Sequence, residues 1–294
     1  MICSAAASIE LKKQKINELN VFPVPDGDTG TNMSMTLGAA ATELRRKPDV
    51  TLTKAADVAA SALLRGARGN SGVILSLLFR GFSKALKGME QADGRDFAAA
   101  LTTGVEAAYK AVMKPAEGTI LTVSRLTADA ARDLAAEDRS IESVLAAAIP
   151  VAKAALDNTV NQNPVLKKAG VVDAGGMGFV VILEGMLSSL QGNDIVADES
   201  AAVNEQADFA EFDSEDITFA FDTVFIVRKS APDVSLEPLR LYLDSIGDSL
   251  VIGEDDEAFK VHVHTNIPGD ALSEAQKYGT LELAKIENMR MQHD

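Results

Sequence analysis

The chain has 294 residues, of which 43 are acidic and 28 basic, so its formal net charge at pH 7 is −15. This charge argues against a nucleic-acid or anionic-membrane partner, because both surfaces repel an acidic protein. A single cysteine, Cys3, excludes an intrachain disulfide and a cysteine-based zinc cluster. No apolar run reaches the roughly 18 residues of a membrane span and no signal peptide opens the chain, so we expect a cytoplasmic protein.

Helical periodicity dominates residues 1–190 and predicts an all-α domain of about eight helices. The absence of Trp and the many alanines favour closely packed helices over a sandwich. One helix is expected before Asn20, and a later one is expected to kink or end near Pro150. The others are expected at residues 33–44, 53–65, 73–86, 97–112, 120–134 and 179–190.

The pattern changes after residue 190. Residues 191–216 are rich in Asp and Glu and poor in large apolar side chains, which predicts a solvated acidic linker. Residues 217–294 form a second domain of α+β type. Its expected elements follow the order β-α-β-β-α-β of the ferredoxin-like split βαβ arrangement: strand 217–227, helix 236–246, strands 249–253 and 259–264, helix 271–277 and strand 281–286.

The most informative loop runs from Asn20 to Met33 and reads Asn-Val-Phe-Pro-Val-Pro-Asp-Gly-Asp-Thr-Gly-Thr-Asn-Met. Asp26 and Asp28 precede a predicted helix directly. Carboxylates placed there can hold a hard cation, while the N–H groups of the helix start can bind an anion. The spacing does not fit an EF-hand calcium loop, and the two prolines spoil the buried strand that an aspartyl-phosphate enzyme needs. A turn without a ligand is the alternative.

Three more glycine-bearing loops precede predicted helices. Residues 65–72 form a candidate anion-binding nest, in which Ser71 contacts a phosphate and Arg68 neutralises it. Residues 115–119 and 172–178 are the other two. If the helices alternate up and down, all four loops can lie at one rim of the domain. Four ordinary interhelical loops, capped by glycine and serine, are the alternative.

The second domain carries a candidate metal site. His262 and His264 alternate on a predicted strand and therefore point to the same face. Asp222 lies on the first strand, which neighbours that strand in the split βαβ order, and it can supply a third ligand. The alternative is that both histidines only pack or hydrogen-bond on the sheet face.

These segments together resemble the ATP-binding subunit of bacterial fatty acid kinase, whose N-terminal domain is similar to the nucleotide-binding L subunit of dihydroxyacetone kinase. The resemblance covers nearly the whole chain. Its most specific segments are Asn20–Met33, residues 66–76 (Gly-Ala-Arg-Gly-Asn-Ser-Gly-Val-Ile-Leu-Ser), 117–123 (Glu-Gly-Thr-Ile-Leu-Thr-Val) and 172–178 (Val-Asp-Ala-Gly-Gly-Met-Gly). It implies an antiparallel helical barrel that binds ATP at one end through its interhelical loops.

The resemblance also implies roles for individual residues. Asp26 and Asp28 would hold two Mg²⁺ ions on the phosphates and form the catalytic pair, and Asn20 stands one residue away from the place of a further metal-ligating Asp. The loop of Asp173, Ala174 and Gly175 would close over the nucleotide. Contacts with phosphates and adenosine are implied for Thr29, Gly30, Thr31, Asn32, Asn70, Ser71, Gly72 and Thr119.

The implied reaction is the transfer of the γ-phosphoryl group of ATP to the carboxylate of a fatty acid, which a separate fatty-acid-binding protein holds; the product is an acyl phosphate. Catalysis would rest on positioning and on metal-assisted charge neutralisation. The position of all three histidines beyond residue 260 agrees with a helical domain that uses no histidine nucleophile. The alternatives are a dihydroxyacetone-type small-molecule kinase and a non-catalytic nucleotide-binding scaffold.

The chain departs from the family in two places. The family's zinc site is built from one Cys and two His, and Asp222 stands here in the place of the Cys, so Asp222, His262 and His264 are candidate Zn²⁺ ligands with less thiolate character. Family members usually continue into a C-terminal domain thought to engage the partner, whereas this chain stops at Asp294. We expect ATP binding to survive without that domain and turnover to depend on it. A homodimer is also implied.

Overall fold

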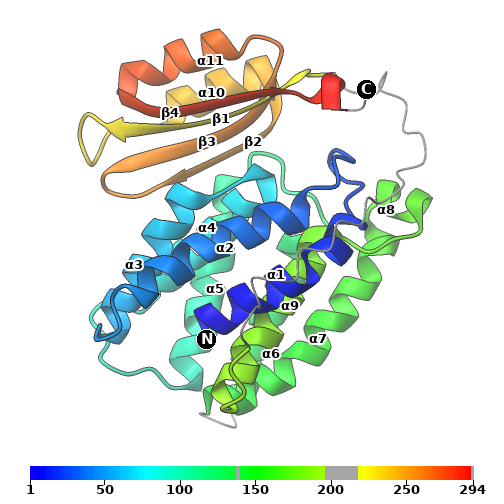
Figure 1. The fold of residues 1–294 in the computed structure, drawn as a ribbon, viewed down its shortest axis with the longest axis vertical. Helices are drawn as coiled ribbons and strands as arrows, with labels where there is room; N and C mark the ends of the chain where they lie inside the picture. Colours follow the sequence, from blue (N-terminus) through cyan, green and yellow to red (C-terminus); the bar gives the residue numbers. More distant parts are fainter. Residues whose placement is uncertain (137–139, 196–217, 293–294) are drawn as a thin grey trace. The chain divides into compact units, whose positions relative to one another are not determined.

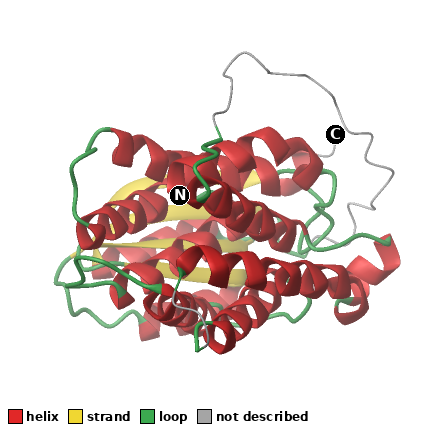
Figure 2. Ribbon diagram, turned by 90° about the horizontal axis from the view of Figure 1, so that it is seen from below, coloured by secondary structure: helices red, strands yellow, loops and turns green. Residues whose placement is uncertain are grey.

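The structure, a computed structural model, describes residues 1–136, 140–195 and 218–292. Contacts between residues divide the chain into two compact units. One contains Met1–Tyr109 and Pro115–Asp208, and the other contains Lys110–Lys114 and Phe209–Asp294. Within the described residues the first unit is built from helices, and the strands belong to the second (Figure 2). No helix in these described ranges is both long and apolar enough to cross a membrane.

Nine α-helices account for the first unit within the described residues (Figure 1). They are α1 (Ile2–Asn17), α2 (Thr29–Arg45), α3 (Leu52–Gly66), α4 (Gly69–Ala85), α5 (Gly94–Ala111), α6 (Ile120–Leu134), α7 (Ile141–Gln162), α8 (Pro164–Ala169) and α9 (Ala174–Leu190). The sequence predicted about eight. The additional one is α8, whose six residues are too few to show a helical period; the side chain of Asn163 caps it by accepting a hydrogen bond from the N–H of Val165.

The helix α7 continues through Pro150 for twelve further residues, so the alternative that it ends there is wrong. A proline inside a helix removes one hydrogen bond and costs roughly 3 kcal/mol. Buried side chains on both sides of it offset that cost, because Val144 and Ala148 before the proline and Ala152 and Leu156 after it all lie in the core.

Small side chains let the helices of the first unit approach one another closely. One buried cluster consists almost entirely of alanines from α5, α6 and α7, with Leu101 and Leu134 packed against it. The helix α1 lies beside both α2 and α9, and α6 lies beside α7 and α9 (Figure 1). The core of this unit is therefore made by helix faces, as the alanine-rich composition predicts.

Among its described residues the second unit contains one four-stranded sheet, two α-helices and two short 3-10 helices, Gln276–Tyr278 and Met289–Gln292. Its elements are β1 (Phe221–Lys229), α10 (Glu237–Ile246), β2 (Gly247–Glu254), β3 (Ala258–Thr265), α11 (Pro268–Ala275) and β4 (Gly279–Asn288). The strand order is β2-β3-β1-β4 and every neighbouring pair is antiparallel. The predicted β-α-β-β-α-β order is therefore found. The strands β2, β3 and β4 are a few residues longer than predicted because their pairing extends beyond the apolar stretches, whereas β1 begins later than predicted, at Phe221, and ends two residues later, at Lys229.

Both helices of the second unit pack on the same side of its sheet (Figure 1). Leu239 and Leu243 of α10 and Ala271 of α11 join a buried cluster with Phe225 and Phe259 from the sheet. Because side chains alternate along a strand, the residues between these core positions, Asp222, His262 and His264 among them, belong to the opposite face.

The predicted acidic linker lies mostly outside the described residues, since 196–217 are not described. The helix α9 ends at Leu190, which is where the helical domain was predicted to end. The exact partition into 1–190, 191–216 and 217–294 remains a prediction.

Candidate functional site

The first candidate loop leads into the N-terminus of α2. Asp28 occupies the position directly before the helix, yet its side chain makes no capping hydrogen bond. Asp26 is exposed and Asp28 is half-buried. The carboxylate of Asp28 thus stands at a helix start without capping it. The N–H groups of the helix start favour an anion, and the carboxylate can ligate the cation that accompanies such an anion.

The buried side chain of Asn20 orders this loop. Its Nδ2 donates to Asp26 Oδ1 at 2.7 Å and to the backbone carbonyl of Val24 at 2.7 Å. Its Oδ1 accepts a hydrogen bond from the hydroxyl of Thr29. The amide therefore ties the carboxylate of Asp26 to the start of α2 and positions it. The role of Asn20 as a magnesium ligand remains a prediction.

Asn17, at the end of α1, contacts the candidate loop and was not predicted from the sequence. Its Oδ1 accepts a hydrogen bond from the backbone N–H of Thr31 at 3.0 Å, and its Nδ2 donates to the Thr31 hydroxyl at 3.0 Å. Because that hydroxyl oxygen already accepts from Asn17, its own proton is directed elsewhere. The sequence feature that could have indicated this contact is a polar residue at the end of a predicted helix, three positions before Asn20.

Close contact between α1 and α2 fixes the first turn of α2. A Cβ on Gly30 would lie 2.1 Å from the backbone oxygen of Lys13. No side chain other than hydrogen fits there. Gly30 is therefore required by the packing of α1 against the loop, whatever it also contributes to ligand binding.

The second candidate loop is attached directly to the first. Gly69 has a φ of +55°, and a Cβ there would lie 2.5 Å from the side-chain nitrogen of Asn32. The hydroxyl of Thr36, one turn further along α2, accepts a hydrogen bond from the N–H of Arg68 at 3.1 Å and donates to the carbonyl of Asn32 at 2.6 Å. The first turns of α2 and α4 are therefore held side by side. Thr36 is a second residue that sequence reasoning missed.

Asn70 presents an unsatisfied polar atom in the first turn of α4. Its Oδ1 is buried and makes no hydrogen bond with any described residue. A buried acceptor without a donor costs about 1–3 kcal/mol, so such an atom usually has a ligand or water as its partner. Ser71 beside it is half-buried, and Gly72 is buried against the hydroxyl of Thr36.

The third and fourth candidate loops are joined by the carboxylate of Asp173. This side chain caps α9 by accepting a hydrogen bond from the N–H of Gly176 at 2.7 Å, and it also accepts one from the N–H of Ile120 at the start of α6. Complete burial raises the pKa of Asp173 to about 6, although these two hydrogen bonds act in the opposite direction. The carboxylate is directed inward and holds two helix starts together.

Thr119 caps α6. Its hydroxyl accepts from the N–H of Leu121 at 3.4 Å and donates to the carbonyl of Ala116 at 2.7 Å. Thr119, Ala174 and Gly175 are all buried. Their contacts with a nucleotide remain predictions.

The N-terminal ends of α2, α4, α6 and α9 lie close to one another. Asn32 and Gly69 join α2 to α4, and Asp173 joins α9 to α6. The link between the two pairs is Gly178, where a Cβ would lie 2.4 Å from the sulfur of Met33 in α2. Each helix start carries a partial positive charge and N–H groups without intrahelical partners, so their convergence favours a multiply charged anion.

The second unit contains the predicted cluster of metal-binding side chains. Asp222 pairs with His264 across β1 and β3, and the candidate ligand atoms of Asp222, His262 and His264 lie within 4.8 Å of one another. The two Nε2 atoms are 3.1 Å apart. That separation suits two ligands of one tetrahedral zinc, each at about 2.0–2.1 Å from the ion.

The protonation state of this cluster also suits a metal. Burial, together with the nearby His264 and Lys260, holds the pKa of His262 well below its usual range, so the ring is in the neutral form that binds metals. His262 Nδ1 lies 3.3 Å from Asp222 Oδ1, and His264 Nδ1 lies 3.5 Å from Asp248 Oδ1. A carboxylate beside the ring nitrogen that does not bind the metal orients histidine ligands in many metal sites, and Asp248, which lies outside the candidate ligand set, has this position beside His264.

Comparison with known families and proteins covers both units. Residues 23–188 match the family model of the DAK2 domain, and residues 218–294 match that of the FakA-like middle domain of fatty acid kinase. The chain is 42% identical over 303 residues to Protein YloV of Bacillus subtilis, covering 100% of this chain and 55% of that protein. Uncharacterised proteins of Staphylococcus saprophyticus and Staphylococcus aureus are 42% and 40% identical over 301 residues, again over 100% of this chain. The chain spans about half the length of these relatives, 54% and 55% of the two staphylococcal proteins.

Proposed function

The chain belongs to the DAK2-domain family and has a FakA-like middle domain of the fatty acid kinase type, and on this basis we propose that it is the ATP-binding subunit of a fatty acid kinase. In this proposal a separate protein binds the fatty acid and presents its carboxylate. The γ-phosphoryl group of ATP is transferred to that carboxylate, which gives an acyl phosphate and ADP. The helices of the first unit would form the antiparallel barrel of the family, with the nucleotide at the end where the four helix starts meet.

The observation that carries this proposal is the convergence of four helix starts beside Asp26 and Asp28. A nucleotide triphosphate needs both a cationic environment for its phosphates and carboxylates for the accompanying Mg²⁺. Helix starts supply the first through backbone N–H groups, and the two aspartates supply the second. The acidic chain thus has a local anion site although its net charge is −15.

Individual residues take distinct parts in the proposed reaction. Asp26 and Asp28 would hold Mg²⁺, which when bound neutralises phosphate charge and orients the transferred group. Asn20 positions Asp26, and Asn17 orients the Thr31 hydroxyl toward the ligand. The segment Thr29–Asn32 together with Ser71 would bind phosphate oxygens, and Asn70 Oδ1 would accept a hydrogen bond from the nucleoside. No nucleophilic side chain of the chain is needed, because the fatty-acid carboxylate is itself the nucleophile.

The second unit is proposed to hold one Zn²⁺ ion through Asp222, His262 and His264. The donor set of two imidazoles and one carboxylate fits this ion. We assign it no part in phosphoryl transfer. A homodimer formed by this protein is a further part of the proposal and is tested by sedimentation of the purified chain.

The test is product analysis with the full-length protein. The protein is incubated with Mg-ATP and a fatty acid loaded on a purified fatty-acid-binding protein, and hydroxylamine is then added. An acyl phosphate reacts with hydroxylamine to give a hydroxamate, whereas a sugar phosphate does not react. Formation of the hydroxamate, dependent on all components, supports the proposal. Phosphorylation of dihydroxyacetone instead, or nucleotide binding without partner-dependent ADP release, would contradict it.

A further inference from the structure

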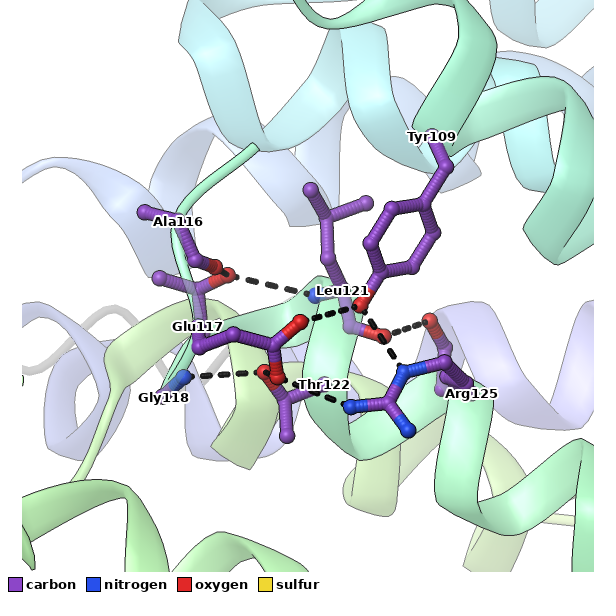
Figure 3. Close-up of polar contacts among 9 residues, drawn as sticks. Tyr109, Ala116, Glu117, Gly118, Leu121, Thr122 and Arg125 are labelled. Atoms are coloured by element: carbon purple, nitrogen blue, oxygen red, sulfur yellow. Dashed lines mark hydrogen bonds and ion pairs between the residues drawn. The ribbon is translucent and has the colours of Figure 1, made fainter. Parts of the chain in front are cut away.

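The segment between α5 and α6 contains a group of polar side chains that neither the nucleotide site nor the metal cluster uses. Tyr109 lies near the end of α5, Glu117 lies in the connecting loop, and Thr122 and Arg125 lie on one face of α6. Figure 3 shows the side chains of Tyr109, Glu117 and Arg125 directed toward one another. All four residues belong to the first unit. We call this group the Glu117 network.

The carboxylate of Glu117 accepts hydrogen bonds from three donors. Tyr109 donates to its Oε1 at 3.1 Å, and both Thr122 and Arg125 donate to its Oε2 at 2.8 Å (Figure 3). The guanidinium of Arg125 also donates from Nε to the Tyr109 oxygen at 3.1 Å. The tyrosine and threonine hydroxyls each donate once and accept once, so both hydroxyl protons have a defined direction.

The network reaches the backbone at the helix start. The N–H of Gly118 donates to the Thr122 hydroxyl at 2.8 Å, which in turn donates to Glu117. Gly118 has a φ of +75°, and a Cβ there would lie 2.9 Å from Gln162 at the end of α7. Directly after it, Thr119 caps α6. The loop is thus held between α5, α6 and α7, and it leads directly into the start of α6.

The pKa of Glu117 agrees with a carboxylate that is ionised and held by its hydrogen-bond donors. Partial burial by itself would raise the pKa of Glu117, but the hydrogen bonds from Thr122, Arg125 and Tyr109 outweigh it and hold that pKa below its usual range. Glu117 and Arg125 keep 51% and 39% of their side chains exposed. Exposed ion pairs contribute little to global stability. The effect of the network is therefore local, on the geometry of the loop.

We propose that the Glu117 network is a positioning device for the nucleotide site: Glu117, Tyr109 and Arg125 hold the loop so that the start of α6 joins the other three helix starts. This inference rests on the proposed function. The loop carries Thr119 and the N–H of Ile120, which Asp173 links to α9. A loop already held in place loses less conformational freedom when a nucleotide binds, and affinity rises accordingly.

The decisive variant is Glu117→Gln. The side-chain amide has the same size as the carboxylate, but an NH₂ group replaces one of the two acceptor oxygens. This NH₂ group cannot accept a hydrogen bond from Tyr109, Thr122 or Arg125. Tyr109→Phe removes a single hydroxyl and serves as a second, milder variant. Arg125→Lys keeps the charge but loses the planar fork that reaches both Tyr109 and Glu117. The control is Glu43→Gln, which breaks an exposed ion pair of 2.7 Å with Arg46 at the opposite end of α2.

Calorimetric titration with Mg²⁺ and a non-hydrolysable ATP analogue gives the affinity of each variant. We expect Glu117→Gln to weaken binding about tenfold, Tyr109→Phe and Arg125→Lys to weaken it less, and Glu43→Gln to leave it unchanged. In the protein without nucleotide, hydrogen exchange at the Gly118 amide should be faster in Glu117→Gln, while the melting temperature changes by only a few degrees.

The contrary outcomes are distinct from one another. Normal affinity of Glu117→Gln contradicts this inference and leaves the proposed function standing. A lower melting temperature with unchanged affinity shows that the network only stabilises the fold, and it also overturns the inference. If the unsubstituted chain binds no nucleotide, the proposed function fails and this inference fails with it.

Discussion

Asn20 donates a hydrogen bond of 2.7 Å to the carboxylate of Asp26, six residues later in the chain. The same amide accepts a hydrogen bond from Thr29 in the first turn of α2. One buried side chain therefore sets the position of an exposed carboxylate relative to a helix start. The arrangement explains how a loop with two glycines and two prolines can hold the carboxylate of Asp26 in a defined position.

Removal of either carboxylate should abolish binding of Mg-ATP. Asp26→Ala and Asp28→Ala each delete an oxygen ligand that Mg²⁺ needs beside the phosphates. Calorimetric titration with Mg²⁺ and a non-hydrolysable ATP analogue measures the loss. The matched control is Asp57→Ala, which removes an exposed carboxylate of α3 that pairs with Lys54. Unchanged affinity in both aspartate variants would exclude the assigned magnesium site.

Two glycines of α2 should respond in opposite ways to the same substitution. Gly30→Ala places a Cβ 2.1 Å from the Lys13 carbonyl oxygen, so we expect a loss of about 1–3 kcal/mol in the free energy of unfolding. Gly38→Ala meets nothing within 4 Å and should stabilise the helix by about 0.5–1 kcal/mol. Urea unfolding of both variants measures the difference, and equal stabilities would contradict the close packing of α1 on α2.

The pH dependence of stability should reveal the buried carboxyl of Asp173. Burial raises its pKa from 3.8 to about 6 in the folded protein, so between these values the folded chain binds more protons than the unfolded chain. Its contribution to stability is complete below pH 3.8 and is lost as the pH rises through about 6. A shift of about 2 units corresponds to a loss on the order of 3 kcal/mol.

The variant Asp173→Asn isolates this contribution, because an amide does not ionise in this range. Urea unfolding at several pH values gives the free energy of unfolding of the parent and of the variant. As the pH rises from 4 to 7, the parent should lose stability relative to the variant. A difference that stays constant over that range would show that Asp173 titrates at its ordinary pKa.

Zinc affinity should follow the ligand set of the second unit. His262→Ala removes one of the two converging imidazoles and should abolish zinc uptake, as measured by elemental analysis and by competition with a coloured chelator. Asp222→Cys adds a thiolate and should bind zinc more tightly than the parent. Absence of zinc from the parent after preparation without chelator, with no uptake of added Zn²⁺, would leave the histidines as sheet residues that only pack against each other.

Patterns among residues close together in the sequence determined much of the secondary structure of this protein and several candidate site residues. Helical periodicity located the helices of the first unit apart from α8, and the sequence of β-rich and helical stretches predicted the β-α-β-β-α-β order of the second. Asp26 and Asp28 were singled out because a glycine-bearing loop places both carboxylates at a helix start, and their role as magnesium ligands remains a prediction. His262 and His264 were recognisable because alternate residues on a strand share a face. These features depend on residues close together in the sequence.

Tertiary structure alone decided which loops meet and what each polar side chain does there. Gly178 touches Met33 only because α9 packs on α2, and Asp173 reaches Ile120 only because α6 lies beside α9. Whether an asparagine or aspartate faces a ligand or the protein interior depends on its neighbours in space, as the inward-directed Asp173 demonstrates. Helix pairing is set by the packing of side chains from distant segments, and no pattern within a single segment encodes it.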